Sequence, residues 1–247
     1  MANFTFNNKH NFEDLNCMIV SPISFPVAIE EIEEETIEGS VTGSLTRRTG
    51  TYNDITIQVK LQLMDINSYE EEYKEKIQAI TEWLFDIADN KLIFDDNKEK
   101  CYLVKRVEIT EFEDYKKFYS RFTVNFICQP FLRYCYEPTY EVSRGQVIFN
   151  NGSIESRPYI ELELPDTESN IQVIVNENIL QINNAKGNVI IDCLLLSCRN
   201  EEGNLRTVGN FPTLIKGNNS ISWTGTINKF RIKNNFMFRG WLNDMFI

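Results

Sequence analysis

The chain has 247 residues, of which 42% are hydrophobic and 25% are charged, and its formal net charge is −11. This composition suits one large or two ordinary domains with a hydrophobic core, and the acidity argues against binding to a nucleic-acid backbone, which requires clustered Lys and Arg. No run reaches the roughly 18–20 consecutive apolar residues that span a bilayer, and no basic region followed by an apolar core opens the chain, so we expect no membrane partner and synthesis in the cytoplasm.

The first part of the chain contains a short strand pair and a dense acidic segment. Residues 4–20 suit two strands around a turn at residues 7–9. Six glutamates then fall within residues 30–38, interleaved with Ile32 and Ile37. Such a segment suits either an electronegative loop facing a pore or a solvated sheet edge. On this segment alone the solvated edge is the favoured interpretation.

A long strand followed by one helix organises the first half of the chain. Residues 47–54 predict a turn-rich lead-in, and Ile55 to Leu63 then alternates apolar and polar residues, as a strand with one buried and one wet face requires. Ser68 with Glu71 has the form of a capping box. Apolar residues then recur at spacings of four and three, which predicts the only substantial helix. The stripe consists of Tyr69, Tyr73, Ile77, Ile80, Leu84 and Ile87, widened by Trp83.

The remaining sequence predicts more strands and a second domain. Residues 101–109 and 120–128 suit two further strands, and residues 130–140, with two prolines and four aromatic residues, suit an inter-domain linker. Short strands separated by turn residues follow at fairly regular intervals, which predicts an antiparallel β-sandwich of about 100 residues. We therefore predict a mainly β protein with one helix, divided into domains at residues 1–133 and 134–247.

The residue types that carry metal and catalytic chemistry are scarce. The six cysteines have irregular spacings, and in a chain without an export signal we expect them to be reduced and to act as small hydrophobic residues. His10 is the only histidine and no C-x-x-C pair is present, so most zinc sites are excluded. Walker-type, G-x-S-x-G and H-E-x-x-H motifs are also absent from the sequence. We predict no metal, no cofactor, no catalytic residue and no enzymatic activity.

An ordered series of landmarks resembles a known family. In the first half these are Phe4-Thr5-Phe6-Asn7, the glycine-bounded segment 39–43, residues 48–54 before the long strand, Trp83-Leu84 in the helix, Tyr102 after an acidic turn, and Phe126-x-Cys128-x-Pro130-Phe131. In the second half they are residues 151–158 (NGSIESRP), 210–214 (NFPTL) and 217–223 (GNNSISW). In this order the chain resembles the distal tail proteins (Dit) of long-tailed bacteriophages that infect Gram-positive bacteria.

This resemblance implies a structural protein of the virion. The first domain would have the tail-tube fold and form a hexameric ring, and the second would be a galectin-like or carbohydrate-binding-module-like sandwich. The homo-hexamer would be the hub of the tail tip or baseplate, between the major tail tube protein and the tail-associated fibre or lysin protein, and in some phages it carries receptor-binding proteins. DNA would pass through an acidic lumen without sequence-specific binding, because negative charge repels phosphates.

In a hub, the functional residues lie at interfaces. The candidates for a subunit interface or the lumen are Glu30, Glu31, Glu33, Glu34, Glu35, Arg47, Arg48 and Tyr52. The helix residues expected to pack on the ring sheet are Tyr73, Ile77, Ile80, Trp83 and Leu84. The aromatic-rich end, residues 236–247, is expected to pack back onto the first domain or a neighbouring subunit, because free ends fray unless they are docked.

Two other classes of function compete with the hub. The first is a carbohydrate-binding accessory protein acting through the sandwich, and the second is a phage-associated hydrolase. A galectin-type sugar site would require a histidine, and none follows His10. Trp223 and Tyr159 are the candidates for stacking on a sugar ring, although buried aromatic residues are commoner in sandwiches. We therefore predict a docking module rather than an active lectin.

Overall fold

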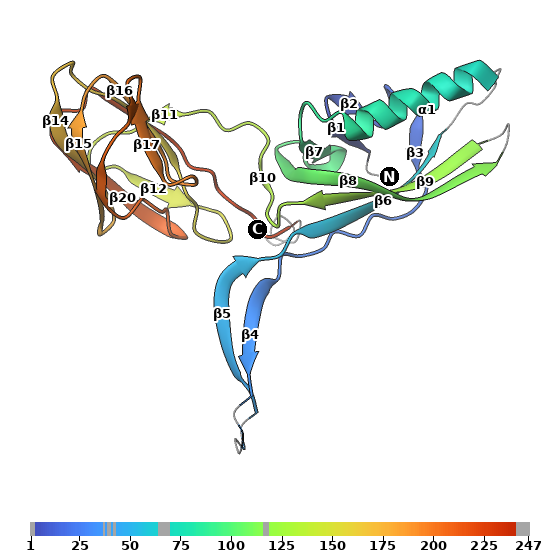
Figure 1. Ribbon diagram of the computed structural model, residues 1–247, viewed down its shortest axis with the longest axis horizontal. Coiled ribbons are helices and arrows are strands. Elements are labelled where there is room, and N and C mark those ends of the chain that lie inside the picture. The colour runs from blue at the N-terminus through green and yellow to red at the C-terminus, as the bar shows by residue number, and fades with distance from the viewer. Residues whose placement is uncertain are drawn as a thin grey trace. The chain divides into compact units, whose positions relative to one another are not determined.

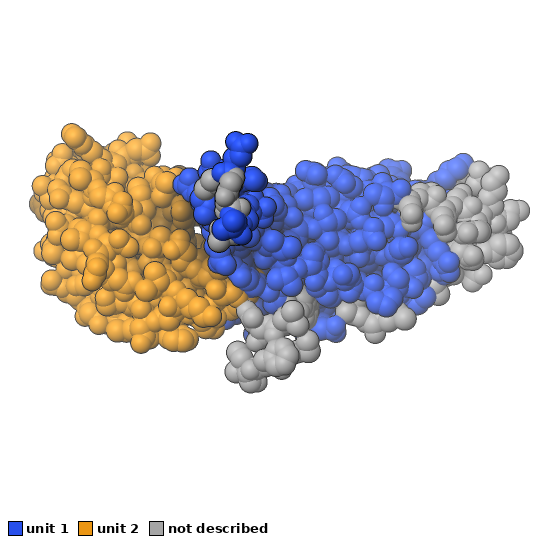
Figure 2. All heavy atoms as spheres, turned by 90° about the horizontal axis from the view of Figure 1, so that it is seen from below, with its two compact units in different colours: residues 1–135, 239–247 blue, residues 136–238 orange. Residues whose placement is uncertain are grey.

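The computed structural model describes residues 3–36, 38, 41, 43–63, 70–115 and 119–240. The chain forms two compact units, Met1–Cys135 with Arg239–Ile247 and Tyr136–Phe238, which Figure 2 colours blue and orange. The predicted fold class, mainly β with one helix, is confirmed for the described residues. No helix in these residues is both long and apolar enough to cross a bilayer.

An antiparallel sheet of eight strands forms the body of the first unit. Its order is β2-β1-β7-β8-β9-β6-β3, and β10 pairs with β8 (Figure 1). The strands are β1 (Phe4–Phe6), β2 (Lys9–His10), β3 (Cys17–Ile19), β6 (Ile55–Leu63), β7 (Lys91–Phe94), β8 (Lys100–Tyr115), β9 (Tyr119–Cys128) and β10 (Arg133–Tyr134). A short 3-10 turn, Asp95–Asn97, separates β7 from β8.

The helix α1 (Glu70–Phe85) covers this sheet (Figure 1). The predicted alternation of β6 produces five buried apolar side chains and four wetter polar ones, and β6 pairs with β9 from Ile55↔Cys128 to Leu63↔Ser120. The helix buries Trp83, whose Nε1 donates to the Phe6 carbonyl at 2.6 Å. The predicted cap residue Ser68 lies outside the described residues.

Asn7 joins the turn between β1 and β2 to the end of the helix. Its φ of 47° is a left-handed conformation that asparagine tolerates. Its Nδ2 donates to the carbonyls of Trp83 and Asp86, both at 2.9 Å, and its Oδ1 accepts from the backbone N–H groups of Ala88 (2.8 Å) and Asp89 (3.2 Å). One side chain therefore bonds a carbonyl that the last turn of the helix leaves without a partner and three backbone groups of the segment that follows it.

A two-stranded sheet, which we call the arm, stands out from the body of the first unit (Figure 1). It consists of β4 (Glu30–Glu35) and β5 (Leu45–Tyr52). The expectation that residues 47–52 form a turn-rich lead-in is wrong, because they pair with β4 as a strand. The irregularity falls where the register shifts between Glu30 and Ile32, opposite Gly50, whose φ is 76°. The glycine that suggested a turn thus accommodates a bulge.

The second unit is a sandwich of two antiparallel sheets. The six-stranded sheet has the order β11-β21-β13-β16-β17-β18 and the five-stranded sheet the order β12-β20-β14-β15-β19. The six-stranded sheet contains β11 (Tyr140–Glu141), β13 (Tyr159–Glu163), β16 (Asn188–Asp192), β17 (Ser197–Asn200), β18 (Gly203–Asn204) and β21 (Lys229–Lys233). The five-stranded sheet contains β12 (Val147–Asn150), β14 (Ser169–Val175), β15 (Asn178–Ala185), β19 (Thr207–Gly209) and β20 (Gly217–Thr224).

The last described residues divide between the units. Phe236 and Phe238 are buried and belong to the second unit, whereas Arg239 belongs to the first. Trp241 and Phe246, on which the predicted docking of the C-terminus partly rests, lie outside the described residues.

Candidate functional site

The arm presents a dense acidic strand to solvent. The side chains of Glu31, Glu33, Glu34 and Glu35 are exposed, and only Glu30 is half-buried. Glu30 Oε2 lies 3.6 Å from Arg48 Nη1, and Arg47 stands opposite Glu33 in the ladder. Because the five glutamates of β4 face only the two arginines of β5, the arm keeps a net negative charge.

The arm also exposes apolar surface that no described residue of the first unit covers. Ile32 is 50% exposed and Leu45 is 59% exposed. An isolated two-stranded hairpin is marginally stable in water, so this sheet gains little from its own packing. These features are typical of a surface that another chain completes.

Tyr52 anchors the base of the arm. Its ring meets the Phe131 ring edge-on, with centroids 4.8 Å apart, and its hydroxyl accepts a hydrogen bond from Arg239 Nη2 at 2.6 Å. The Arg239 guanidinium carbon lies 5.2 Å from the centroid of the same ring. Tyr52 is therefore half-buried inside the first unit. Sequence reasoning missed Arg239, which is 187 positions away and belongs to no motif.

The helix residues that are expected to pack on the sheet lie on the side of α1 that covers the sheet. Ile80, Trp83 and Leu84 are at most 4% exposed, and Tyr73 and Ile77 are half-buried. The Tyr73 hydroxyl lies 2.6 Å from Ser120 Oγ on β9. This arrangement places the five residues in packing contacts of the unit.

The two candidates for sugar stacking lie on different sheets. Trp223 is on β20, and its ring stacks on the buried Phe230 of β21, with centroids 4.9 Å apart and planes 14° apart. It therefore faces the interior of the sandwich. Tyr159 is on β13 and alternates with the buried Ile160, so it faces outward from the other sheet. Burial raises the pKa of Tyr159 above its usual value. The structure does not bring these two rings together.

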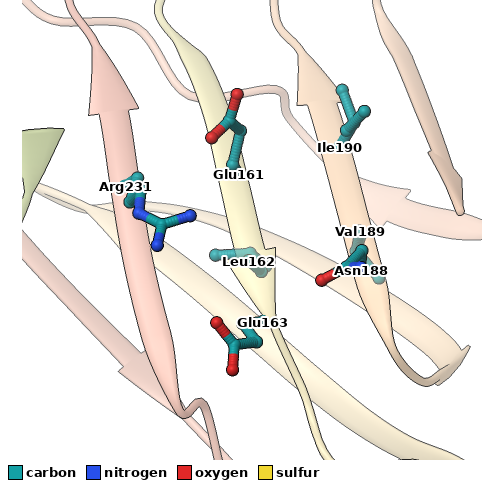
Figure 3. Close-up of a pocket in the computed structure, with 7 residues that line it drawn as sticks. All are labelled: Glu161, Leu162, Glu163, Asn188, Val189, Ile190 and Arg231. Atoms are coloured by element: carbon teal, nitrogen blue, oxygen red, sulfur yellow. The ribbon is translucent and has the colours of Figure 1, made fainter. Parts of the chain in front are cut away.

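A shallow hollow of about 280 Å³ lies on the outer side of β13, β16 and β21 (Figure 3). Its polar lining includes Glu161, Glu163, Asn188 and Arg231. Lys229 Nζ donates to Glu163 Oε2 at 2.8 Å, and this hydrogen bond lowers the pKa of Glu163. The lining offers charged and amide groups for recognition of a polar molecule, but neither a thiol nor an imidazole as a nucleophile or base.

Five of the six cysteine side chains are buried as small core residues, and Cys135 is half-buried. Burial raises the pKa of Cys17, Cys101, Cys128 and Cys193 to about 12. A thiol with such a pKa is protonated at neutral pH and is a poor nucleophile or metal ligand. Within the described part of the chain, no group of three or more His, Cys, Asp or Glu side chains is placed to hold a metal ion.

Acidity is concentrated in the first unit. By sequence, this unit has 25 acidic and 16 basic residues, whereas the second unit has 11 and 9. The electrostatic character noted for the whole chain is therefore mainly a property of the helix-covered sheet and the arm.

Comparisons with known proteins agree with this architecture. Residues 9–128 match the family model of the phage tail protein RIFT-related domain. No curated protein sequence matches the chain. The fold is similar to the crystal structure of the Dit protein of phage SPP1, described as a paradigm of the hub adsorption apparatus in phages that infect Gram-positive bacteria. The TM-score is 0.74 at 14% identity, covering 98% of this chain and 100% of that chain. The predicted resemblance to distal tail proteins is thereby confirmed at the level of the fold.

Proposed function

We propose that this chain, which has a phage tail protein RIFT-related first domain and the fold of a Dit protein, is the structural hub of a phage tail tip. Six copies would form a ring through their first units. The ring would join the major tail tube protein to the tail-associated fibre or lysin protein, and the second unit, a galectin-like sandwich, would face outward as a docking module for receptor-binding proteins. The protein would be part of the virion.

The observation that carries this proposal is the extent of the similarity. The fold corresponds to the SPP1 Dit protein over nearly all of both chains, so it includes the sandwich as well as the tail domain. A shared tail domain alone would suit any tail protein. The family match and the full-length fold together support a hub rather than an isolated sugar-binding module.

The arm supports assembly into a ring. It has exposed Ile32 and Leu45 and too little core of its own, so a neighbouring copy would stabilise it. We infer that the arm lies against the next subunit and that the excess acidity of the first unit faces the channel. A negatively charged wall repels phosphates, so DNA would pass without binding.

The test is the native mass of the purified protein, with negative-stain images of the same sample. The proposal expects a six-fold particle with a central hole, either alone or after addition of the tail tube and fibre proteins. The variant Ile32→Asp should prevent the ring while leaving the helix signal in circular dichroism unchanged. The matched control is Phe12→Asp, at a residue 44% exposed in the same unit outside the arm. A monomer that persists with both partners would refute the hub.

A further inference from the structure

The five-stranded sheet of the second unit carries no charged residue. Its strands β12, β14, β15, β19 and β20 read VIFN, SNIQVIV, NILQINNA, TVG and GNNSISWT, without Asp, Glu, Lys or Arg. In a protein in which 25% of residues are charged, an exposed sheet of this kind is unexpected. Phe149 is 64% exposed, and Val147, Ile179 and Val208 are also exposed. We call the outward side chains of this sheet the neutral face.

The other sheet of the same sandwich has the opposite character. Its outward positions include Glu161, Glu163, Lys229 and Arg231. Of these, Glu161, Glu163 and Arg231 line the hollow in Figure 3. The need for solubility therefore explains the charged outer face of the six-stranded sheet, but it does not explain the neutral face. Depletion of charge together with exposed aromatic and aliphatic residues is the composition of the centre of a protein interface.

A second apolar feature lies at the end of the charged sheet. The turn between β16 and β17, residues 193–196, ends in Leu194, Leu195 and Leu196, which are 46%, 73% and 56% exposed. Turns at the surface normally carry Gly, Asn, Asp, Ser or Pro. We call these three residues the leucine turn.

The leucine turn has a fixed conformation. Asp192 Oδ1 accepts hydrogen bonds from the backbone N–H groups of Leu194 and Leu195, both at 3.0 Å. Leu196 has a φ of 52°, in the left-handed region that is costly because its Cβ approaches the following carbonyl oxygen. Unusual backbone held by its surroundings is a reason to look for a function. Here the backbone holds three leucines out in water.

We propose that the leucine turn of one copy packs on the neutral face of a second copy. The two features cannot meet within one sandwich, because the turn belongs to the six-stranded sheet and the neutral face points away from that sheet. The leucine turn is apolar and the neutral face is uncharged, so burying one against the other leaves no charged side chain unpaired. The charged outer face of the six-stranded sheet would not offer this to either of them. A protrusion and a patch at different places on one chain make a head-to-tail contact, which is the kind of interface from which rings are built when the rotation between copies closes.

This inference rests on the proposed function, since the ring would bring the sandwiches of neighbouring copies within reach. A lipid surface is a poorer fit for the turn. Asp192 stands at its base, and the second unit has more acidic than basic residues, so anionic lipids would repel it. The contact would add to the ring without being its only support.

Cross-linking between two copies that each carry one introduced cysteine tests the contact. One full-length copy would carry Leu195→Cys and the other Phe149→Cys or Ile179→Cys, with Cys135→Ser in all of them because Cys135 is the one native cysteine that is not buried. The copies would be mixed and treated with a short bismaleimide. We expect a cross-linked pair in which mass spectrometry joins position 195 to position 149 or 179. The matched control partner, Glu161→Cys on the charged sheet, should give none.

The charge variant Leu195→Asp gives a second measurement. Burial of one leucine corresponds to roughly a 10- to 100-fold change in association, so the cross-link at a given concentration should fall accordingly. The absence of a cross-link to position 149 or 179, or an equal yield with position 161, would overturn the inference. The native mass measures ring formation independently of the cross-link. Rings without the cross-link would refute this contact alone, and the cross-link without rings would refute the hexamer alone.

Discussion

Replacing Ile80 with Asp tests the link between the helix and the sheet of the first unit. Ile80 is 4% exposed on the side of α1 that covers the sheet. Loss of its buried side chain removes about 1.5–3 kcal/mol of stability, and an unpaired carboxylate in the same place costs at least a further 2 kcal/mol or raises its own pKa. Since single domains are stable by only about 5–15 kcal/mol, Ile80→Asp should unfold the first unit.

Circular dichroism can read this outcome, because α1 is the one α-helix among the described residues. The helix signal should disappear in Ile80→Asp, while limited proteolysis should still leave a fragment that contains the second unit, Tyr136–Phe238. The milder Ile80→Val should cost about 0.5–1.5 kcal/mol in urea unfolding. Glu34→Lys, on the exposed arm, is the control and should remain folded. A folded and helical Ile80→Asp protein would refute the packing described here.

Three further changes have defined outcomes. Asn7→Gly keeps the left-handed backbone but removes four hydrogen bonds, so it should lower the free energy of unfolding by about 1–3 kcal/mol. The control is Asn8→Gly at the next position, where φ is 59°, and it should have little effect. Tyr52→Phe removes the acceptor of the Arg239 hydrogen bond and should cost about 1.5 kcal/mol in urea unfolding; no loss relative to Tyr136→Phe, at a residue 83% exposed, would contradict the anchor. At pH 8, a thiol reagent should modify only Cys135 quickly in the native protein and all six cysteines in denaturant, since burial raises the pKa of four others to about 12 and that of Cys198 to about 11.

Local periodicity explains which parts of the fold were predictable. The alternation in residues 55–63 and the spacing in the helix are determined by neighbours in sequence, so β6 and α1 agree with the predictions. The strand β5 was mistaken for a turn because its Thr-Gly pair forms a bulge only when β4 pairs with it. Pairing with β4 determines the conformation of β5, and the sequence of β5 alone does not reveal this pairing.

The interaction surfaces were harder to predict for a related reason. The contact of Tyr52 with Arg239 joins residues 187 positions apart, and no pattern links them. The neutral face is assembled from five strands that are not consecutive in the chain, so its lack of charge becomes visible only when the strand order is known. Trp223 illustrates the converse, since a residue that suits a sugar site by type faces the interior by position.

The charges of the two units predict how salt affects assembly. Copies of the first unit, each with 25 acidic and 16 basic residues, repel one another, and this repulsion is screened as the Debye length falls from about 10 Å at 0.1 M salt to about 3 Å at 1 M. The contact proposed for the leucine turn involves no charged side chain, so salt should not weaken it. Ring formation, measured by native mass over this range, should therefore require less protein at high salt. If the rings instead dissociate as salt is added, ion pairs between subunits outweigh the net repulsion, and the interface must be sought where Arg47 and Arg48 meet the glutamates of a neighbouring arm.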